Sequence, residues 1–185
     1  MSETTQSAPE GVEGIGAADG GERLAAAVEG TEHKWIVTRD AMPTVEVSRE
    51  DAHGVLERLR DAGFEVCTLV TAVDHYPATP RFELVWQLLS VRNNERVRIE
   101  CRVEESDATV PTCTDLWPGA AYGERECFDM FGIRFDGHEN LKRLLMPEGY
   151  DHFPLRKDFP HQGIQPDRLY REWDAERRKD WTPES

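Results

Sequence analysis

The sequence predicts an α+β fold: a mixed four-stranded sheet in the order β-α-β-β-β-α, with helices packed on one face, followed by an extended irregular C-terminal arm. A helix pattern follows a short β-branched segment, and three strand patterns then succeed one another too closely for crossover helices. After about residue 133 the chain breaks into short apolar runs. The 185 residues suit a single core with tails. We therefore predict a disordered acidic N-terminal tail over 1–32, an α+β core domain over 33–132 and an extended C-terminal arm over 133–185.

The N-terminal segment is rich in glycine, alanine and acids and poor in large apolar residues. Residues 1–32 hold seven acids against Arg23 alone. Such a composition buries too little apolar surface to offset the entropy lost on ordering, so we predict disorder. ERLAAAVEG, residues 22–30, could form one helical turn or two.

The core elements follow from local patterns. In TVEVS, residues 44–48, apolar and polar residues alternate and three of the side chains are β-branched, so the segment predicts a strand. Ser48 is a good N-cap for the next helix, and Gly63 is a suitable stop at its C-terminal end. Strand patterns then cover 64–76, 81–92 and 95–103, and the asparagine pair before the last of them suits a hairpin turn.

A second helix is predicted over 120–131, within the stretch ERECFDMFGIRFDGH that begins at Glu124. At 100° per residue, Glu124 falls within the apolar arc, while Arg125 and Asp129 lie together on its flank at i,i+4 spacing. An unpaired buried carboxylate costs several kcal/mol, so we expect Glu124 to be protonated, or partnered by a cation or by backbone donors. Gly132 should end this helix, and the next residues should return as a short strand. The apolar arc comprises Cys127, Phe128, Met130 and Phe131.

Three functions compete for this stretch. A glycosidase-like carboxylate pair is disfavoured, because Glu124 and Glu126 lie about 200° apart on a helix. A metal site on His138, His152 and His161 is disfavoured as well, because their spacing matches no recognised ligand motif. The third possibility is a structural joint whose partners come from another chain, since arginine and aromatic residues are preferred interface anchors.

Composition narrows the class further. The net charge of −14 disfavours binding to nucleic acid or to anionic lipid headgroups. No apolar run approaches the roughly 20 residues of a membrane helix, and the N-terminus has no signal-peptide pattern, so we expect a cytosolic chain. The four cysteines form no CxxC pair, which predicts reduced thiols in or near the core.

The arm resembles an interface segment more than a closed domain. Prolines bracket PLRKDFP, residues 154–160, and prolines resist helix formation. Within it Leu155 and Phe159 are candidate apolar anchors, and Arg156 and Lys157 can reach carboxylates. From 133 to 158 five basic residues balance five acidic ones, which is unusual in so acidic a chain. We therefore expect this arm to dock on a partner chain; a solvated loop packed on its own domain is the alternative.

At this point the sequence resembles a known family. ERECFDMFGIRFDGHENLKRLL is similar to the signature of the C-type subunit of NADH:quinone oxidoreductase (respiratory complex I), the 30 kDa subunit family. TAVDHY, DLWPGA, LLMPEGY and PLRKDFP also fit, so the likeness spans roughly residues 44–160 in one order. Three positions depart from the pattern. Gly123 replaces a bulky aromatic residue, which predicts a looser helix start, Glu139 replaces a proline, and His152 replaces a glycine. The matching signature positions are Glu124, Arg125, Glu126, Asp129, Met130, Phe131, His138, Lys142, Leu144 and Leu145.

The resemblance implies a non-catalytic scaffold in the hydrophilic arm of that complex. The chain would dock on the D-type subunit of complex I, the 49 kDa homologue, with the B-type and I-type subunits nearby. It would carry no cofactor, metal or catalytic residue itself, because FMN and the iron–sulfur clusters lie in partner subunits. It would sit at the cytoplasmic face of the cell membrane, held there only through the complex. The expected interface residues are Glu124, Arg125, Glu126, Asp129, Phe131, His138, Arg143, Leu155, Arg156, Lys157 and Asp158.

Two alternatives stay open. A matching subunit of a membrane-bound hydrogenase or of a coenzyme-F420 dehydrogenase would share the signature but serve another electron donor. A free-standing metal-dependent hydrolase built on the histidines would belong to a different class of protein, and it predicts bound metal in the isolated chain.

Overall fold

The structure is a computed structural model that describes residues 18–164, 172, 174–176, 178 and 179. The parts of the predicted tail and arm that fall on the remaining residues therefore lie outside the described chain. The elements are α1 Ala18–Ala27, β1 His33–Ile36, β2 Thr44–Val47, α2 Arg49–Asp61, β3 Val66–Asp74, β4 Phe82–Ser90, β5 Glu95–Val103, β6 Thr109–Pro111, α3 Ala121–Phe131 and β7 Arg134–Asp136, with short 3₁₀ turns η1 Glu105–Asp107 and η2 Pro118–Ala120.

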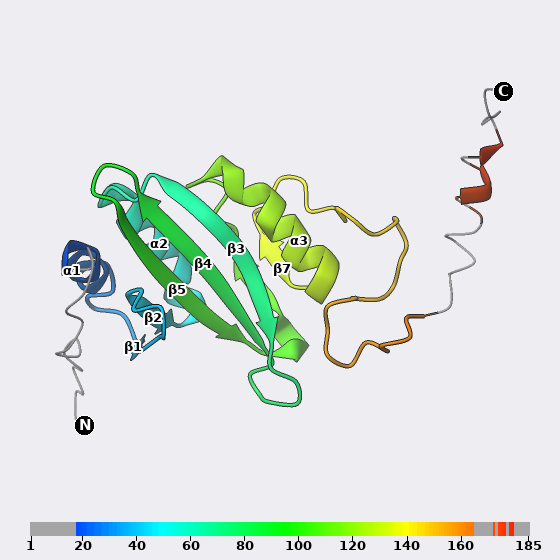
Figure 1. Ribbon diagram of the computed structural model, residues 1–185, viewed down its shortest axis with the longest axis horizontal. Coiled ribbons are helices and arrows are strands. Elements are labelled where there is room, and N and C mark those ends of the chain that lie inside the picture. The colour runs from blue at the N-terminus through cyan, green and yellow to red at the C-terminus, as the bar shows by residue number, and fades with distance from the viewer. Residues whose placement is uncertain (1–17, 165–171, 173, 177, 180–185) are drawn as a thin grey trace.

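A mixed five-stranded sheet forms the centre of the molecule, in the order β1-β2-β5-β4-β3 (Figure 1). Strand β2 runs parallel to β5, and the other neighbours are antiparallel. The α+β class and the three consecutive strands are confirmed, but the predicted sheet lacked β1. This strand escaped prediction because it is only four residues long, HKWI, and only partly buried, so it shows no clear alternation.

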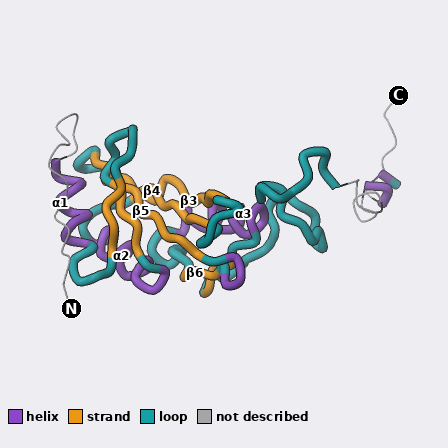
Figure 2. The backbone as a smooth tube through the Cα atoms, turned by 90° about the horizontal axis from the view of Figure 1, so that it is seen from below, coloured by secondary structure: helices purple, strands orange, loops and turns teal. Residues whose placement is uncertain are grey.

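Helix α2 packs on one face of the sheet, as predicted (Figures 1 and 2). The Ser48 hydroxyl accepts a hydrogen bond from the backbone N–H of Asp51 at 3.1 Å, which satisfies one of the free donors of the first turn. Its buried residues Val55, Leu56 and Leu59 recur at helical spacing and join the main core.

The predicted disorder over 1–32 is wrong for the described part of that segment, because α1 is a helix packed beside α2 and β5. The helical turns expected within residues 22–30 are present, but the helix begins earlier than that stretch. Leu24 and Val28, four residues apart, are fully buried and share the core with Ala27. Arg23 also donates to the carbonyl of Ala62 at 3.3 Å. Three apolar side chains on one helix face are enough to order the segment, although the composition around them is acidic.

Helix α3 lies directly against β3, and Gly123 makes the approach possible. A Cβ atom at Gly123 would stand 2.9 Å from Val70 Cβ and 3.0 Å from its carbonyl oxygen. The glycine therefore lets the start of α3 lie close to β3. The looser helix start that we predicted from the missing aromatic residue is wrong. The turn before the helix is fixed as well, because the Trp117 indole donates to the carbonyl of Phe64 at 3.2 Å.

Gly132 ends α3 in the left-handed conformation, with φ 81°, as predicted for a C-terminal stop. The chain then returns as β7, which pairs in parallel with β6 and buries Ile133 and Phe135. The predicted arm therefore begins too early at 133, because residues 133–136 belong to the core. Residues 137–164 form an irregular segment that runs away from the sheet past α3 (Figure 1, yellow to orange), and the arm means these residues from here on.

The four cysteines are free thiols, as predicted, and three of them are buried. Burial raises the pKa of Cys101 to about 12, so this thiol stays protonated and unreactive at neutral pH.

Candidate interface site: the joint between core and arm

The predicted buried carboxylate of α3 is confirmed. Glu124 is fully buried, and its side chain accepts hydrogen bonds from the Thr112 hydroxyl at 2.5 Å and the backbone N–H of Cys113 at 2.7 Å. Both donors come from the segment that links β6 to η2. Neutral donors from the same chain therefore satisfy the carboxylate, and Glu124 ties α3 to that segment instead of facing a partner.

Asp129 forms the first anchor of the arm. One carboxylate oxygen accepts the backbone N–H groups of residues 144–146 at 3.0, 2.6 and 2.9 Å, and the other accepts from Arg143 Nη1 at 2.7 Å. Burial alone would raise the pKa of Asp129, but the N–H donors of Met146 and Leu145, together with Arg143, outweigh it and hold the pKa below its usual range. Asp129 is thus an ionised, fully buried binding point for the arm backbone.

The predicted pairing of Arg125 with Asp129 is wrong. The Arg125 guanidinium instead donates to the carbonyls of Lys142 at 3.0 Å and Arg143 at 3.1 Å. The i,i+4 rule assumes an exposed helix flank, whereas Asp129 points into the protein and takes its cation from the arm. Arg125 and Asp129 therefore bind neighbouring parts of the arm backbone: Arg125 donates to its carbonyl groups, and Asp129 accepts from its N–H groups.

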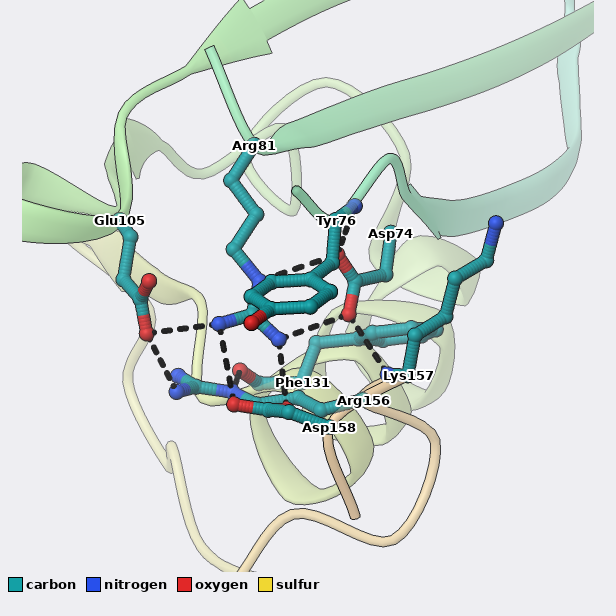
Figure 3. A network of polar contacts seen from close by, with 8 residues as sticks. All are labelled: Asp74, Tyr76, Arg81, Glu105, Phe131, Arg156, Lys157 and Asp158. Atoms are coloured by element: carbon teal, nitrogen blue, oxygen red, sulfur yellow. Dashed lines mark hydrogen bonds and ion pairs between the residues drawn. The ribbon is translucent and has the colours of Figure 1, made fainter. Parts of the chain in front are cut away.

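Asp74 and Arg81 form the second anchor, at the two ends of the β3–β4 connection (Figure 3). Arg81 donates to both oxygens of Asp74, at 3.0 and 2.8 Å, and reaches Asp158 of the arm at 2.6 Å. The backbone N–H of Lys157 donates to Asp74 at 2.7 Å. This bidentate geometry is the strong form of the arginine–carboxylate pair, and here it is almost completely buried.

Electrostatics at this second anchor favour the charged forms of both partners. Burial would raise the pKa of Asp74, but hydrogen bonds from Arg81 and from the N–H groups of Lys157 and Tyr76 lower it well below its usual range. Hydrogen bonds to Asp74 and Asp158 raise the pKa of Arg81. Both residues are therefore ionised at any physiological pH, and the pair is a fixed part of the joint.

Arg156 of the arm binds the core between the two anchors. Its Nε donates to the carbonyl of Phe131 at 2.7 Å, and its Nη1 lies 3.1 Å from Glu105 Oε1. The guanidinium stacks 4.4 Å from the ring centroid of Phe153 and 5.1 Å from that of Phe82. Burial lowers the pKa of Arg156, although the nearby Glu105 partly offsets this.

Glu105 links Arg156 to the second anchor, because the same carboxylate oxygen lies 2.9 Å from Arg81 (Figure 3). Gly132 leaves room for the arm at this point. A Cβ at Gly132 would stand 2.7 Å from the Phe153 ring and 2.8 Å from the Arg156 guanidinium. The joint is therefore built around a position where only glycine fits.

The other predicted site residues divide by exposure. Phe131 is buried and lies edge-on to Phe82, and His138 lies 3.3 Å from the carbonyl of Ala121 at the start of α3. In contrast, Glu126 and Lys157 present exposed side chains, and Leu155 is 52% exposed. The side chains of Glu126, Leu155 and Lys157 thus point to solvent in the isolated chain.

The arm also carries a groove. It has a volume of about 610 Å³ and is lined by the prolines and side chains of the PLRKDFP element. Because Arg156 and Asp158 fix this element to the core, the groove is presented in one orientation. Its lining residues are Pro154, Leu155, Arg156, Lys157, Phe159, Pro160, His161 and Gly163.

Three charged residues of the joint were not predicted from the sequence: Asp74, Arg81 and Glu105. Asp74 and Arg81 lie within patterns that we assigned to strands, where charged residues at the ends are common. The available signal was that TAVDHY, which contains Asp74, belongs to the family pattern. Within the described residues no three histidine, cysteine, aspartate or glutamate side chains gather as a metal site would require, and the three histidines named above do not come together.

Fold and joint define a class of protein: an α+β domain that holds an irregular arm in one fixed orientation. The chain belongs to the family described as respiratory-chain NADH dehydrogenase, 30 kDa subunit, whose family model matches residues 45–165. It is 52% identical over 102 residues to the second C-type subunit of NADH-quinone oxidoreductase from Rhizobium meliloti (strain 1021), a match that covers 55% of this chain and 56% of that protein.

Further comparisons agree with this family. The second C/D-type subunit of NADH-quinone oxidoreductase from Aquifex aeolicus (strain VF5) is 52% identical over 96 residues, which cover 51% of this chain and 16% of that protein. A solved trypsin-resistant fragment (1–134) of Nqo5 has a TM-score of 0.56 at 29% identity, over 65% of this chain and 95% of that one. A chain of the membrane-bound sulfane sulfur reductase, an archaeal respiratory membrane complex, shares the fold at 24% identity, with a TM-score of 0.65 over 91% and 97% of the two chains.

No described helix is both long enough and apolar enough to cross a membrane.

Proposed function

We propose that this chain is a non-catalytic scaffold subunit of the peripheral arm of a proton-translocating NADH:quinone oxidoreductase. In such a complex, electrons pass from NADH through FMN and iron–sulfur centres in partner subunits to quinone. The observation that carries the proposal is the family match over residues 45–165, because it includes both α3 and the arm. No cofactor is assigned to this chain, and it would reach the cytoplasmic face of the membrane only through its partners.

The D-type subunit is the partner that we propose for the arm, with the B-type and I-type subunits as further neighbours. The Aquifex aeolicus relative carries the double designation C/D, which supports a D-type sequence as the neighbour of a C-type one. In this chain the exposed residues Leu155 and Lys157 lie on a segment that the core holds rigidly, and such a segment can dock with little further loss of entropy. The buried members of the predicted set, Glu124 and Asp129, would act indirectly by holding that segment in place.

An equivalent subunit of a membrane-bound hydrogenase or of a coenzyme-F420 dehydrogenase is the second candidate. The fold shared with the sulfane sulfur reductase chain is compatible with it.

The test is a gentle detergent extraction of cells that carry a tagged full-length chain, followed by affinity capture, mass spectrometry and metal analysis. Recovery in stoichiometric amounts with a D-type subunit and NADH-binding subunits would support the proposal. Hydrogenase subunits in their place would favour the second candidate. A chain recovered alone with bound metal would return attention to the histidines and to a hydrolase.

A further inference from the structure

One face of the central sheet carries no helix. The three long strands present this face to the viewer in Figure 1, whereas α2 lies behind them. Strand register identifies the side chains on it, because neighbours in one cross-strand row point the same way. Val45, Ile99 and Trp86 form a fully buried row on the helix-covered side. The next row, Glu46–Glu100–Val85–Thr71, therefore faces away from the helices.

Glu100 stands at the centre of this open face and is only 8% exposed. Among the residues that the structure describes, none donates a hydrogen bond to its carboxylate or forms an ion pair with it. The two arginines that flank it along β5 are already engaged. Arg98 binds Asp40 at 2.6 Å, and Arg102 binds Glu83 at 2.7 Å.

The surroundings of Glu100 disfavour its charge. Burial raises its pKa, as do the nearby carboxylates of Glu83 and Glu46, while Arg98 and Arg102 only partly offset them. A buried carboxylate is normally paired or hydrogen-bonded. Within the described chain, the carboxylate of Glu100 is thus left without a direct cationic partner at the centre of the open face.

Aliphatic side chains lie on the same face along the edge strand β3, which β4 separates from the strand of Glu100. Val66, Leu69 and Val73 of β3 are 39%, 40% and 39% exposed. Their cross-strand partners on β4 are Leu89, Gln87 and Glu83, so all three lie on the open face. The irregular register between Cys67 and Leu69 keeps Val66 on this side. An exposed apolar strip on the same face as a largely buried carboxylate is the composition of an interface core with one polar anchor.

We propose that the helix-free face of the sheet is a second docking surface, for a protein partner that places one arginine or lysine against Glu100 and aliphatic side chains against Val66, Leu69 and Val73. This surface is separate from the core–arm joint, and it requires only that the chain work within an assembly. A second copy of the chain fits poorly, because it would bring the same acidic face and the net charge of −14.

The first test is Glu100→Gln in the full-length chain, with Glu57→Gln on the exposed side of α2 as the matched control. Glu100→Gln removes the unfavourable charge, so the melting temperature of the isolated chain should stay equal or rise. The same change removes the partner of the incoming cation, so the chain should dissociate from the purified assembly roughly tenfold faster or more. Glu57→Gln should change neither quantity.

The outcomes separate a docking role from a structural one. A lower melting temperature for Glu100→Gln would make Glu100 a structural residue, and an unchanged dissociation rate would leave the face without a partner; either result overturns the proposal. If the wild-type chain itself enters no assembly, the proposed scaffold function fails instead, and the two failures are therefore distinguishable.

A photo-crosslinking amino acid at Leu69 identifies the occupant within the intact assembly. We expect an adduct with another protein of the assembly, at a peptide that contains an arginine or a lysine. An adduct with residues 165–185 of the same chain or with a second copy would overturn the choice of partner. The absence of any protein adduct would overturn it as well.

Discussion

Arg81 of the core holds Asp158 of the arm at 2.6 Å, although the two residues lie 77 positions apart in the chain. The same guanidinium forms the bidentate pair with Asp74, so one side chain joins a strand end to the arm. The pairing is possible because the β3–β4 connection and the PLRKDFP element meet beside α3. This contact makes the arm a part of the fold up to at least Asp158, and it gives the joint a measurable stability.

The first prediction concerns the buried ion pair. Asp74→Asn should destabilise the isolated chain by about 3–5 kcal/mol, because it leaves the buried Arg81 without its main counter-charge. Urea unfolding monitored by circular dichroism measures this loss. The control is Asp61→Asn, which removes an exposed pair with the adjacent Arg60 and should have almost no effect. Equal losses in the two variants would show that the Asp74–Arg81 pair does not hold the joint.

The second prediction concerns acid. Asp74 and Asp129 both have a lower pKa in the folded chain than their ordinary value of 3.8, so the unfolded chain binds protons more readily. Their contribution is therefore fully present above about pH 4 and is lost as the pH falls through the lowered folded values. Glu100 has the opposite sign, because its pKa is raised. Urea unfolding at a series of pH values from 7 to 2 should show stability falling in acid. Asp74→Asn should reduce the slope of the unfolding free energy against pH by the equivalent of about one proton. An unchanged slope would contradict the lowered pKa of Asp74.

The third prediction concerns the glycine at the joint. Gly132→Ala should cost about 1–3 kcal/mol, because alanine disfavours φ 81° and its Cβ would overlap the Phe153 ring. In this variant, hydrogen exchange at residues 144–158 should also become faster than in the wild-type chain, whereas exchange in the sheet should stay unchanged. Gly54→Ala is the matched control: it lies within α2 with nothing within 4 Å of the added carbon, so it should stabilise the chain by about 0.5–1 kcal/mol. Unchanged exchange in the arm of Gly132→Ala would show that the arm does not depend on this close approach.

Local patterns predicted the elements whose causes are local. The Ser48 cap, the Gly132 stop and the burial of Glu124 on the apolar arc each depend on residues within a few turns, and each was predicted correctly. Contacts between distant segments were not predictable in this way. Asp129 takes its cation from Arg143, fourteen residues away, because the arm folds back over α3. The one or two helical turns expected over 22–30 underestimated α1 for the same reason, since packing against α2 and the sheet orders it.

The last prediction separates the residues that hold the arm from those that it presents. Arg143 is almost buried against Asp129, so Arg143→Ala should destabilise the isolated chain by several kcal/mol. Leu155 is 52% exposed, so Leu155→Ser should change the stability of the isolated chain by less than about 0.5 kcal/mol. If the arm docks on a partner, however, Leu155→Ser should still reduce recovery of the chain in the assembly, because it removes an apolar anchor from the interface. Glu148→Gln, another exposed change in the arm, provides the control. Normal assembly by Leu155→Ser would show that the partner contacts a different face, and the open face of the sheet around Glu100 would then be the first to examine.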